Sequence, residues 1–531
     1  MSKICLINPP TTLSSSRALY FPMALVCLGS VLKKKGYESS IIDFDLAVRE
    51  NSSLGTWEAF KEYAVHELQG TQSRIFGISS ISSNYPIALL LAAAIKERIP
   101  DARVILGGPQ PSSVPEETLR ACPWVDVIVI GEGEETLLDL VKTDWTKDSL
   151  RTIPGIAFLE NREPVITPKR QLLDNLDTIP LPDFSLVPLK KYLAINPAIP
   201  LVEAGRGCPF LCSFCSTALM WERNFRVKTP ARVLKEMRRL NEDYGLTSFS
   251  LTHDNFTTSH RYVDEFCGYF AQYNSEGFIW SASARPDTLN MDRLQALRDA
   301  GCRGLFFGID SGSPTIQKVI HKNLKLDPID ELIKRAASFG IEITSSFVLG
   351  FPEETREDLD QTVSFACKTR LHGGAIVEMH PLSPLTGTSI QIKNASKLEW
   401  RPHSRNLSHH PISDVEISDF IGKYPALFSS FYSIPLPQLG DIHIPTLAVF
   451  YESLTNDVPE VLERILNYTK LKPLELLEAW NAWRVENYPT KTIERKFIFH
   501  TFGQFVKFLS SKQEMMKTPL NYQQETAPIS A

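Results

Sequence analysis

The sequence contains no hydrophobic run that is long enough to cross a membrane. The apolar residues 18–32 fall short of the about 20 that a spanning helix needs, and a proline and a glycine interrupt them. Three lysines and Gly36 follow, a pattern typical of the C-terminal end of a helix that packs on a sheet. No secretory signal with a cleavage site is recognised before the apolar residues 4–7. We therefore expect neither a membrane span nor a secreted protein.

An excess of positive charge is also missing. The chain has 56 Lys and Arg against 61 Asp and Glu, a formal net charge of −5, so a nucleic-acid-binding surface is not expected. Its nine cysteines are odd in number and lie mostly in apolar runs, which is typical of buried thiols in a reducing cytosol. At 531 residues the sequence predicts a cytoplasmic protein of two or three domains.

Three of the cysteines share one short segment. Cys208, Cys212 and Cys215 have the spacing CxxxCxxC, and no further cysteine occurs before Cys267. Thiolates prefer iron–sulfur clusters or zinc to hard cations, and clusters usually take four of them. Three cysteines without a local fourth therefore indicate a [4Fe–4S] cluster with one iron left open. The alternative is a zinc knuckle, although zinc sites are usually closed by a second CxxC or a His pair.

Residues 1–145 are predicted to form a doubly wound parallel sheet, because short β-branched strands alternate with helices. The strands are expected at 4–7, 39–44, 75–79, 103–106 and 125–130, and the helices at 22–35, 56–68, 86–98, 115–121 and 134–141. In such sheets a ligand binds beyond the carboxyl ends of the strands. Polar residues and glycines gather at these ends, namely residues 8–10, Asp43, 79–85, 107–110 and 131–134.

The rest of the chain divides into three parts. Proline-rich residues 146–196 are predicted to be an extended linker. Residues 197–400 contain six strand–helix units, which suggest an incomplete (β/α)6 barrel with its chemistry at the carboxyl ends of the strands. Residues 401–531 are predicted to be helical. There, Trp480 and Trp483 share a helix face and are interpreted as core residues rather than as a wall against a substrate.

The cysteine segment, with Phe214 before its third cysteine, resembles the radical S-adenosylmethionine (radical SAM) superfamily. In that superfamily the open iron chelates the amino and carboxylate groups of S-adenosylmethionine, which an electron from the cluster cleaves to a 5′-deoxyadenosyl radical. Upstream, the ordered motifs NPP (8–10), LGGPQ (106–110) and GEGEETL (131–137) resemble the cobalamin-binding domain that precedes many radical SAM domains. The resemblance covers about residues 1–390.

The resemblance implies roles for single residues. The S-adenosylmethionine contacts would come from Phe214 at the adenine, Asp254 and Asn255 near the amino group, Ser283 and Arg285 near the carboxylate, and Asp310 and Ser311 of the GIDSGS segment, where Asp replaces the family's usual Glu. The cobalamin contacts would come from Asn8, Pro9, Ser79, Ser82, Ser83, Gly107, Gly108, Gln110, Gly131, Glu132 and Gly133. Each residue has an ordinary alternative role as a helix cap, a turn or a surface ion pair.

One motif of the cobalamin mutases is absent. The DxHxxG loop, whose histidine ligates cobalt, does not occur, and His66 is interpreted as a solvent-exposed residue of a helix. If cobalamin binds, its lower face is therefore expected to have no histidine from this domain.

The resemblance implies a cobalamin-dependent radical SAM enzyme that methylates an unactivated carbon of a natural product, peptide or lipid with two S-adenosylmethionine molecules. It also implies an external electron donor such as flavodoxin or ferredoxin. Two alternatives stay open: a cobalamin-binding radical SAM enzyme that rearranges or cyclises its substrate without methyl transfer, and a non-catalytic iron–sulfur or zinc sensor.

Overall fold

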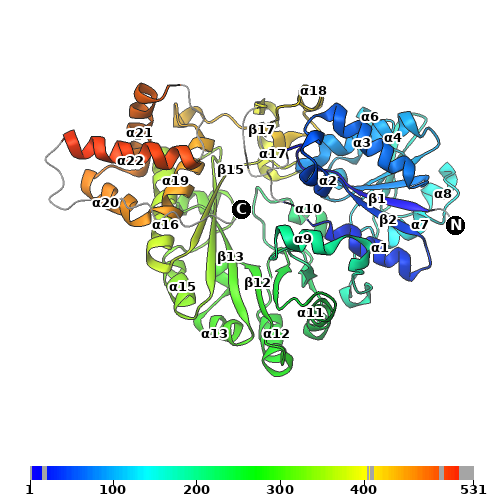
Figure 1. The fold of residues 1–531 in the computed structure, drawn as a ribbon, viewed down its shortest axis with the longest axis horizontal. Helices are drawn as coiled ribbons and strands as arrows, with labels where there is room; N and C mark the ends of the chain where they lie inside the picture. Colours follow the sequence, from blue (N-terminus) through cyan, green and yellow to red (C-terminus); the bar gives the residue numbers. More distant parts are fainter. Residues whose placement is uncertain are drawn as a thin grey trace.

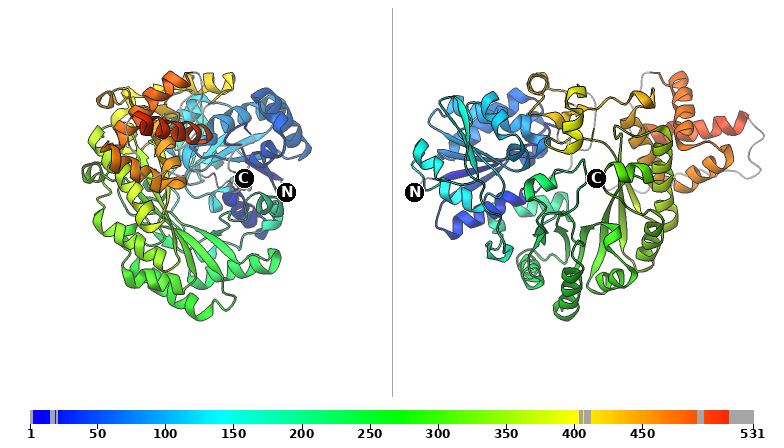
Figure 2. Two further views of the ribbon diagram at one scale, coloured as in Figure 1. Left: turned by 60° about the vertical axis from the view of Figure 1, so that its left-hand side comes forward. Right: turned by 180° about the vertical axis from the view of Figure 1, so that it is seen from behind.

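The computed structural model describes residues 3–14, 19, 21–402, 406, 412–489 and 495–512. Two α/β units lie next to each other, and a helical C-terminal part flanks the second of them (Figure 1). The turned views show the first unit and the C-terminal helices on opposite sides of the molecule, with the barrel strands between and below them (Figure 2). The fold class predicted from the sequence, a doubly wound domain followed by a partial barrel, is confirmed.

The first unit is built on a seven-stranded sheet in the order β2-β1-β3-β4-β5-β6-β7. Its five parallel strands are β1 (Ile4–Asn8), β2 (Ser39–Asp43), β3 (Ile75–Ser79), β4 (Arg103–Gly107) and β5 (Val127–Val129). Its helices include α1 (Met23–Lys34), α2 (Phe44–Glu50), α3 (Trp57–Gly70), α4 (Tyr85–Arg98), α5 (Pro109–Ser113), α6 (Pro115–Ala121) and α7 (Glu134–Leu140). Separate apolar cores cover the two faces of the sheet. The strand order reverses between β1 and β3, where such sheets open a crevice for a ligand.

The predicted linker, residues 146–196, is more structured than expected. After α8 (Lys147–Arg151), strands β6 (Ile156–Glu160) and β7 (Glu163–Ile166) continue the first sheet as antiparallel neighbours. They pair because a tight turn at residues 161–162, both with positive φ, folds the chain back on itself. Only the following segment, which ends with α9 (Leu189–Ile195), connects to the second unit.

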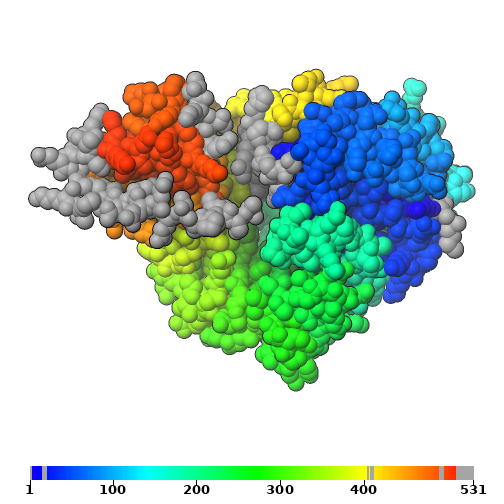
Figure 3. All heavy atoms as spheres, viewed as in Figure 1, coloured from blue at the N-terminus to red at the C-terminus, as the bar shows by residue number. Residues whose placement is uncertain are grey.

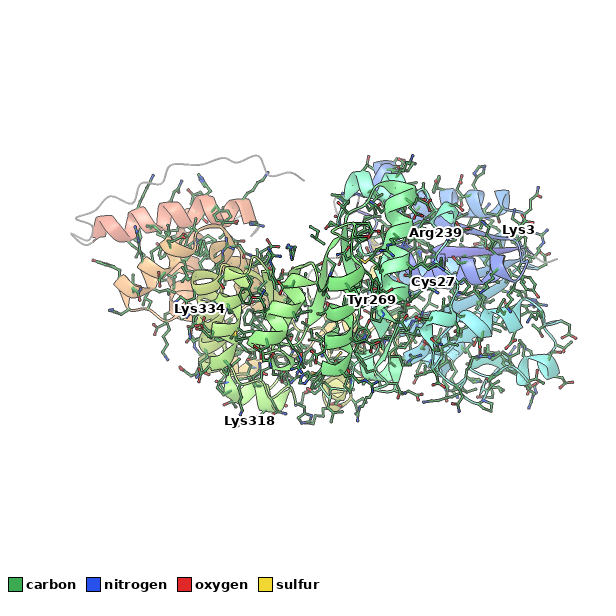
Figure 4. The ribbon with its side chains drawn as sticks, turned by 90° about the horizontal axis from the view of Figure 1, so that it is seen from below. Lys3, Cys27, Arg239, Tyr269, Lys318 and Lys334 are labelled. Atoms are coloured by element: carbon green, nitrogen blue, oxygen red, sulfur yellow. The ribbon has the colours of Figure 1, made fainter. Side chains whose placement is uncertain are left out.

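The second unit is an open sheet of six parallel strands in the order β15-β14-β13-β12-β11-β8. The strands are β8 (Val202–Glu203), β11 (Ser248–Thr252), β12 (Ile279–Ala284), β13 (Cys302–Asp310), β14 (Glu342–Leu349) and β15 (Ile376–Pro381). Outside them lie α11 (Pro230–Tyr244), α12 (His260–Tyr273), α13 (Met291–Asp299), α14 (Pro314–Val319), α15 (Asp327–Ser338) and α16 (Arg356–Gly373). The view from below shows the helices that carry Arg239, Tyr269 and Lys334 along this outer layer (Figure 4).

The chain then returns to the first unit. Helix α17 (Ser389–Asn394) leads to the short strands β16 (Glu399–Trp400) and β17 (Tyr432–Ser433) and to α18 (Val415–Lys423), which packs on α4. A longer helix is predicted over 415–429, but α18 ends at Lys423 because Pro425 follows and cannot donate a helical hydrogen bond. This segment therefore joins the two units from the side opposite the linker.

The last helices pack against the barrel rather than against the first unit (Figure 3). They are α19 (Ile444–Asp457), α20 (Pro459–Thr469), α21 (Pro473–Asn487) and α22 (Arg495–Lys512). Trp480 and Trp483 lie in the barrel's core cluster, which confirms their interpretation as core residues. No helix in the described parts of the chain has both the length and the apolar character required to cross a bilayer.

Candidate functional site between the two sheets

The cysteine segment is a loop held open by a short antiparallel pair, β9 (Gly205–Arg206) and β10 (Arg226–Val227), with α10 (Thr217–Trp221) between them. The loop begins at Gly207, whose φ is +91°. A Cβ at this position would lie 1.8 Å from the carbonyl oxygen of Asn224, so only glycine fits the turn. The backbone of Ser213 anchors the middle of the loop: it donates to the Ile320 oxygen at 3.0 Å and accepts from the Ile390 nitrogen at 3.1 Å.

The three thiols of this loop suit a cluster. Cys208, Cys212 and Cys215 are all partly exposed, whereas the other six cysteines are buried. Burial raises the pKa of Cys208, and it raises that of Cys212 to about 11, so in the ligand-free loop these groups are thiols that become thiolates on metal binding. Among the described residues, no three Cys, His, Asp or Glu side chains converge as one metal ion requires. A cubane cluster instead takes one thiolate at each iron corner.

Asp254, predicted near the amino group of S-adenosylmethionine, lies at the carboxyl end of β11 and contacts the cysteine loop. Its Oδ2 accepts from the Gly207 nitrogen at 2.7 Å, and its Oδ1 accepts from the Thr217 hydroxyl at 3.3 Å. The neighbouring Asn255 is buried and accepts a hydrogen bond from Thr257. In this structure Asp254 therefore shapes the cysteine loop, whereas Asn255 bonds within its own segment.

Phe214 packs against an apolar cluster. Its ring meets that of Phe351 edge-on, with centroids 5.6 Å apart, in an apolar patch at the end of β14. Glu354 holds this GFPEET turn, because its Oε2 accepts from the nitrogens of Gly350 and Phe351 at 2.6 and 3.1 Å. Burial raises the pKa of Glu354 to about 8.

Three other predicted S-adenosylmethionine ligands are occupied by protein contacts. Arg285 pairs with Asp287 through Nε and Nη2, at 2.8 and 3.0 Å, and does not present a free fork. Asp310 pairs with the buried Lys322. Ser311 is fully buried and bonds Thr362 of α16. Ser283 is half-buried on β12, between the buried Ala282 and Ala284. Sequence reasoning placed these residues at the correct strand ends but did not detect their partners, which come from distant segments.

The predicted cobalamin residues divide between two cavities at the carboxyl edge of the first sheet. A mostly apolar cavity of about 390 Å³ is lined by Ser79, Gly107, Gly108, Gly131, Glu132 and Gly133, together with barrel residues that include Glu203, Trp221 and Thr252. A second cavity of about 330 Å³ is lined by Ser82, Ser83 and Gln110. A Cβ at Gly131 would meet no atom within 4 Å, so its φ of +83°, and not a close contact, favours glycine there. The larger cavity is mostly apolar, and hydroxyl and amide groups line the second, so the two together offer both apolar and polar contacts to a ligand.

Asn8 and Pro9 support this site instead of lining its two cavities. The Asn8 amide donates to Asp43 at 2.9 Å, and the Pro9 oxygen accepts from Asn84 at 3.1 Å. The Gln110 amide donates to Thr386 at 3.1 Å and to the Leu427 oxygen at 2.9 Å, and so it also connects the first unit to later parts of the chain.

Ile81 is a site residue that sequence reasoning missed. It is 42% exposed and, with Pro109 and Met220, lines both cavities. Its loop is rigid, because Asn84 Oδ1 accepts from the Ile81 nitrogen at 2.9 Å and from the Ser80 hydroxyl at 2.8 Å. Gly108 supports the loop from below, where a Cβ would lie 2.4 Å from the Ser80 oxygen. An isoleucine held out into a ligand cavity has no sequence signal beyond its position after a strand.

A buried ion network forms part of the wall of the larger cavity. Arg206, next to the cysteine loop, donates to Glu132 and Glu134 of the GEGE loop at 2.7 Å each and to Glu203 at 2.8 Å. Arg226 reaches Glu132 at 2.9 Å. Although burial acts upward on its pKa, Glu203 is held below its usual range by Arg206 and Lys228. The Glu132 carboxylate, predicted to face cobalamin, therefore joins the two units, while its loop still lines the cavity.

His66 is exposed on α3, with 86% of its side chain accessible, as the sequence predicts. In the described part of the chain no histidine lines either cavity.

Comparisons with known proteins cover both units. The family model for the radical SAM superfamily matches residues 202–366, and the model for the B12 binding domain matches residues 11–141. An uncharacterized methyltransferase of Pyrococcus horikoshii is 30% identical over 83% of this chain and 94% of its own length. The anaerobic magnesium-protoporphyrin IX monomethyl ester cyclase of Cereibacter sphaeroides is also 30% identical, over 58% of this chain and 52% of its own length.

Among solved structures, the radical S-adenosylmethionine methyltransferase TsrM from Kitasatospora setae has a TM-score of 0.64. The match covers 87% of this chain and 90% of TsrM at 17% identity, and TsrM was solved with cobalamin and a [4Fe–4S] cluster bound. At this identity the likeness is one of fold.

Proposed function

Because this chain belongs to the radical SAM enzymes that carry a cobalamin-binding domain, we propose that it methylates an unactivated carbon of a natural-product, peptide or lipid substrate with two S-adenosylmethionine molecules. Its cofactors are a [4Fe–4S] cluster, S-adenosylmethionine and cobalamin. When bound, the cluster supplies the electron that cleaves one S-adenosylmethionine to a radical, and cobalamin carries the methyl group.

One observation carries the proposal: the larger cavity is shared by both units. Glycine loops of the first sheet, Glu203 and Thr252 at barrel strand ends, and Trp221 just after the cysteine loop all line it. A group held there would lie beside the cluster site, so a radical and a methyl donor would reach the same substrate carbon. Such proximity replaces an encounter in solution with a reaction between held groups.

The chain's own residues would then act in three ways. Cys208, Cys212 and Cys215 would hold three irons and leave the fourth for S-adenosylmethionine. Phe214 and the turn fixed by Glu354 would form an apolar contact for the adenine. The Arg206 network would keep the two cofactor sites at a fixed separation and exclude water from this side of the cavity.

The substrate pocket is proposed at the carboxyl ends of β14 and β15. A cavity of about 330 Å³ there is lined by Gly350 and Leu382 and covered by residues 433–437, Gly440 and residues 442–445. Arg401 and His443 supply its basic groups, and burial, assisted by Arg401, lowers the pKa of His443. Because the cover comes from the C-terminal part, we propose that this part selects the substrate.

An experiment with S-adenosylmethionine labelled at its methyl group tests the function. With reduced enzyme and the true substrate, we expect a labelled product, together with both S-adenosylhomocysteine and 5′-deoxyadenosine. An unlabelled product with 5′-deoxyadenosine alone would establish the alternative, cyclisation or rearrangement, which the similarity to the protoporphyrin cyclase favours. If the reduced protein does not cleave S-adenosylmethionine under dithionite, the remaining alternative is the non-catalytic iron–sulfur or zinc sensor.

Cobalamin placement has a separate test. Wild-type protein loaded with cob(II)alamin is expected to show no nitrogen superhyperfine coupling from a protein imidazole in its paramagnetic resonance spectrum. Ile81→Trp is expected to lower cobalamin uptake, because residue 81 lines both cavities. Ile166→Trp, on an exposed position of β7, is the control and should leave uptake unchanged. Coupling in the wild type, or full uptake by Ile81→Trp, would contradict this placement.

We further propose that the enzyme receives electrons from an external donor such as flavodoxin or ferredoxin. It would act in the cytoplasm and bind no nucleic acid. All nine cysteines are free, which supports a reducing compartment.

A further inference from the structure

Two buried cations lie beside the Cys212 corner of the cluster site. Arg285, 7% exposed, places its Nη1 3.9 Å from Cys212 Sγ, within reach of an N–H···S hydrogen bond. Its Nη2 donates to the main-chain oxygen of Lys322, whose own side chain is also buried. The guanidinium lies on the ring of Phe210, 3.9 Å from its centroid. Asp287 pairs with the guanidinium of Arg285, and this ion pair helps to hold the guanidinium beside the Cys212 sulfur.

The Lys322 side chain is also fixed by its neighbours. Its ammonium occupies space that Gly308 leaves open, since a Cβ at Gly308 would lie 3.0 Å from Nζ. It pairs with Asp310, which has a φ of +66° and follows a bulge in β13, a conformation that a residue other than glycine rarely adopts.

Gln317 fixes the loop that carries Lys322. Its Nε2 donates to the oxygens of Ile309 and Ser311 at 2.8 and 2.6 Å, and its Oε1 accepts from the Leu324 nitrogen at 3.2 Å. The strained Asp310 and the lysine are therefore held in place from both ends of the segment.

The positive charges of this arrangement act on the cluster site at its Cys212 corner. The Arg285 guanidinium lies within hydrogen-bond reach of Cys212 Sγ, and the same guanidinium donates to the main-chain oxygen of Lys322. Reduction of a cluster adds one negative charge, which nearby cations and N–H···S bonds stabilise more strongly in a buried site than in water. Both cations therefore favour the reduced state.

We propose that Arg285 and Lys322 are positioning residues that raise the reduction potential of the cluster through its Cys212 corner. One electron passes from a low-potential one-electron donor to the cluster; the donor is oxidised, the cluster is reduced, and no proton moves. The two side chains thereby bring the cluster within reach of such a donor. This inference rests on the proposed cluster at Cys208, Cys212 and Cys215.

The test is a redox titration of the reconstituted holoprotein without S-adenosylmethionine, followed by paramagnetic resonance. Arg285→Gln and Lys322→Gln remove one charge each, and Arg285→Lys retains it. At the wild-type midpoint, we expect the ratio of reduced to oxidised cluster to fall about tenfold in both Gln variants, which for one electron is about 59 mV. Arg285→Lys should recover most of the shift. Arg238→Gln, in an exposed pair with Glu276, is the control and should not move the potential.

Iron and sulfide analysis of every variant separates the two levels of the inference. Wild-type protein without about four irons and four sulfides would overturn the cluster itself. Variants with full cluster content and an unchanged potential would overturn the tuning role, including the case in which only the affinity for S-adenosylmethionine falls. If a Gln variant does not fold, Arg285→Lys and Lys322→Arg decide the question: both keep the positive charge, so a near-wild-type potential in both is expected, and a large shift in either one with full cluster content would contradict a role of charge.

Discussion

Replacement of Cys208, Cys212 and Cys215 by alanine is expected to abolish the iron–sulfur absorbance and all reductive cleavage of S-adenosylmethionine. No other thiol can substitute for them. The remaining six cysteines are buried, five of them in the apolar cores and Cys27 at the wall of the larger cavity, and burial raises their pKa values to between about 11 and about 12. A thiol that resists ionisation and lies inside a packed core is a poor metal ligand.

The measurement is iron and sulfide content per chain after anaerobic reconstitution, with circular dichroism to show that the fold is intact. Cys267→Ala is the matched control, because this buried cysteine lies on α12 and should not affect the cluster. A triple variant that retained about four irons per chain, as an intact cluster of this type would, would refute the assignment.

Arg206→Met is expected to destabilise the protein more than any surface change. The substitution leaves Glu132, Glu134 and Glu203 buried without their shared cation, and Arg206 itself is only 7% exposed. Removing one partner of a buried ion pair typically costs about 3–5 kcal/mol, whereas an exposed pair contributes about 0–1 kcal/mol. Because the network joins the GEGE loop to the barrel, the loss should also loosen the larger cavity.

Denaturant unfolding of the full-length protein measures the decrease in the free energy of unfolding. Faster hydrogen exchange at residues 131–134 should show that the GEGE loop is the part that loosens. Arg238→Met removes a surface pair with Glu276 and is expected to stay within about 0.5 kcal/mol of wild type. A loss of less than about 1 kcal/mol for Arg206→Met, against the 3–5 expected of a buried pair, would mean that the network does not hold the units together.

Local patterns in the sequence were sufficient for the fold. Strand β3 was predicted with its observed bounds, and helices such as α6 were predicted in the same way, because apolar periodicity and proline positions act within a few residues. The cysteine loop could also be predicted from the sequence. Its three cysteines, with short spacings, and the glycine that its turn requires all lie in one segment. The pair β6–β7 was missed, because a short antiparallel addition to a sheet depends on what the neighbouring edge offers.

The functions of single polar residues were less accessible. Glu132 and Arg285 lie at the strand ends where the sequence places ligand contacts, yet their charges meet Arg206 and Asp287. The ion-pair partner of a charged side chain often lies on a segment far away in the sequence. Motif spacing, which describes neighbouring residues only, therefore does not predict that partner. Lys322 and Ile81 had no signal of their own for the same reason.

The sequence by itself determined the two α/β units, the three-cysteine loop and the glycine-rich strand ends, because periodicity, turns and ligand spacing are short-range properties. Only the tertiary structure decided that Leu398, Trp400 and residues 412–432 return to the first unit, that a buried ion network joins the two sheets, and that Arg285 lies beside Cys212. Those features depend on packing and on the pairing of buried charges, which take shape only when distant segments come together.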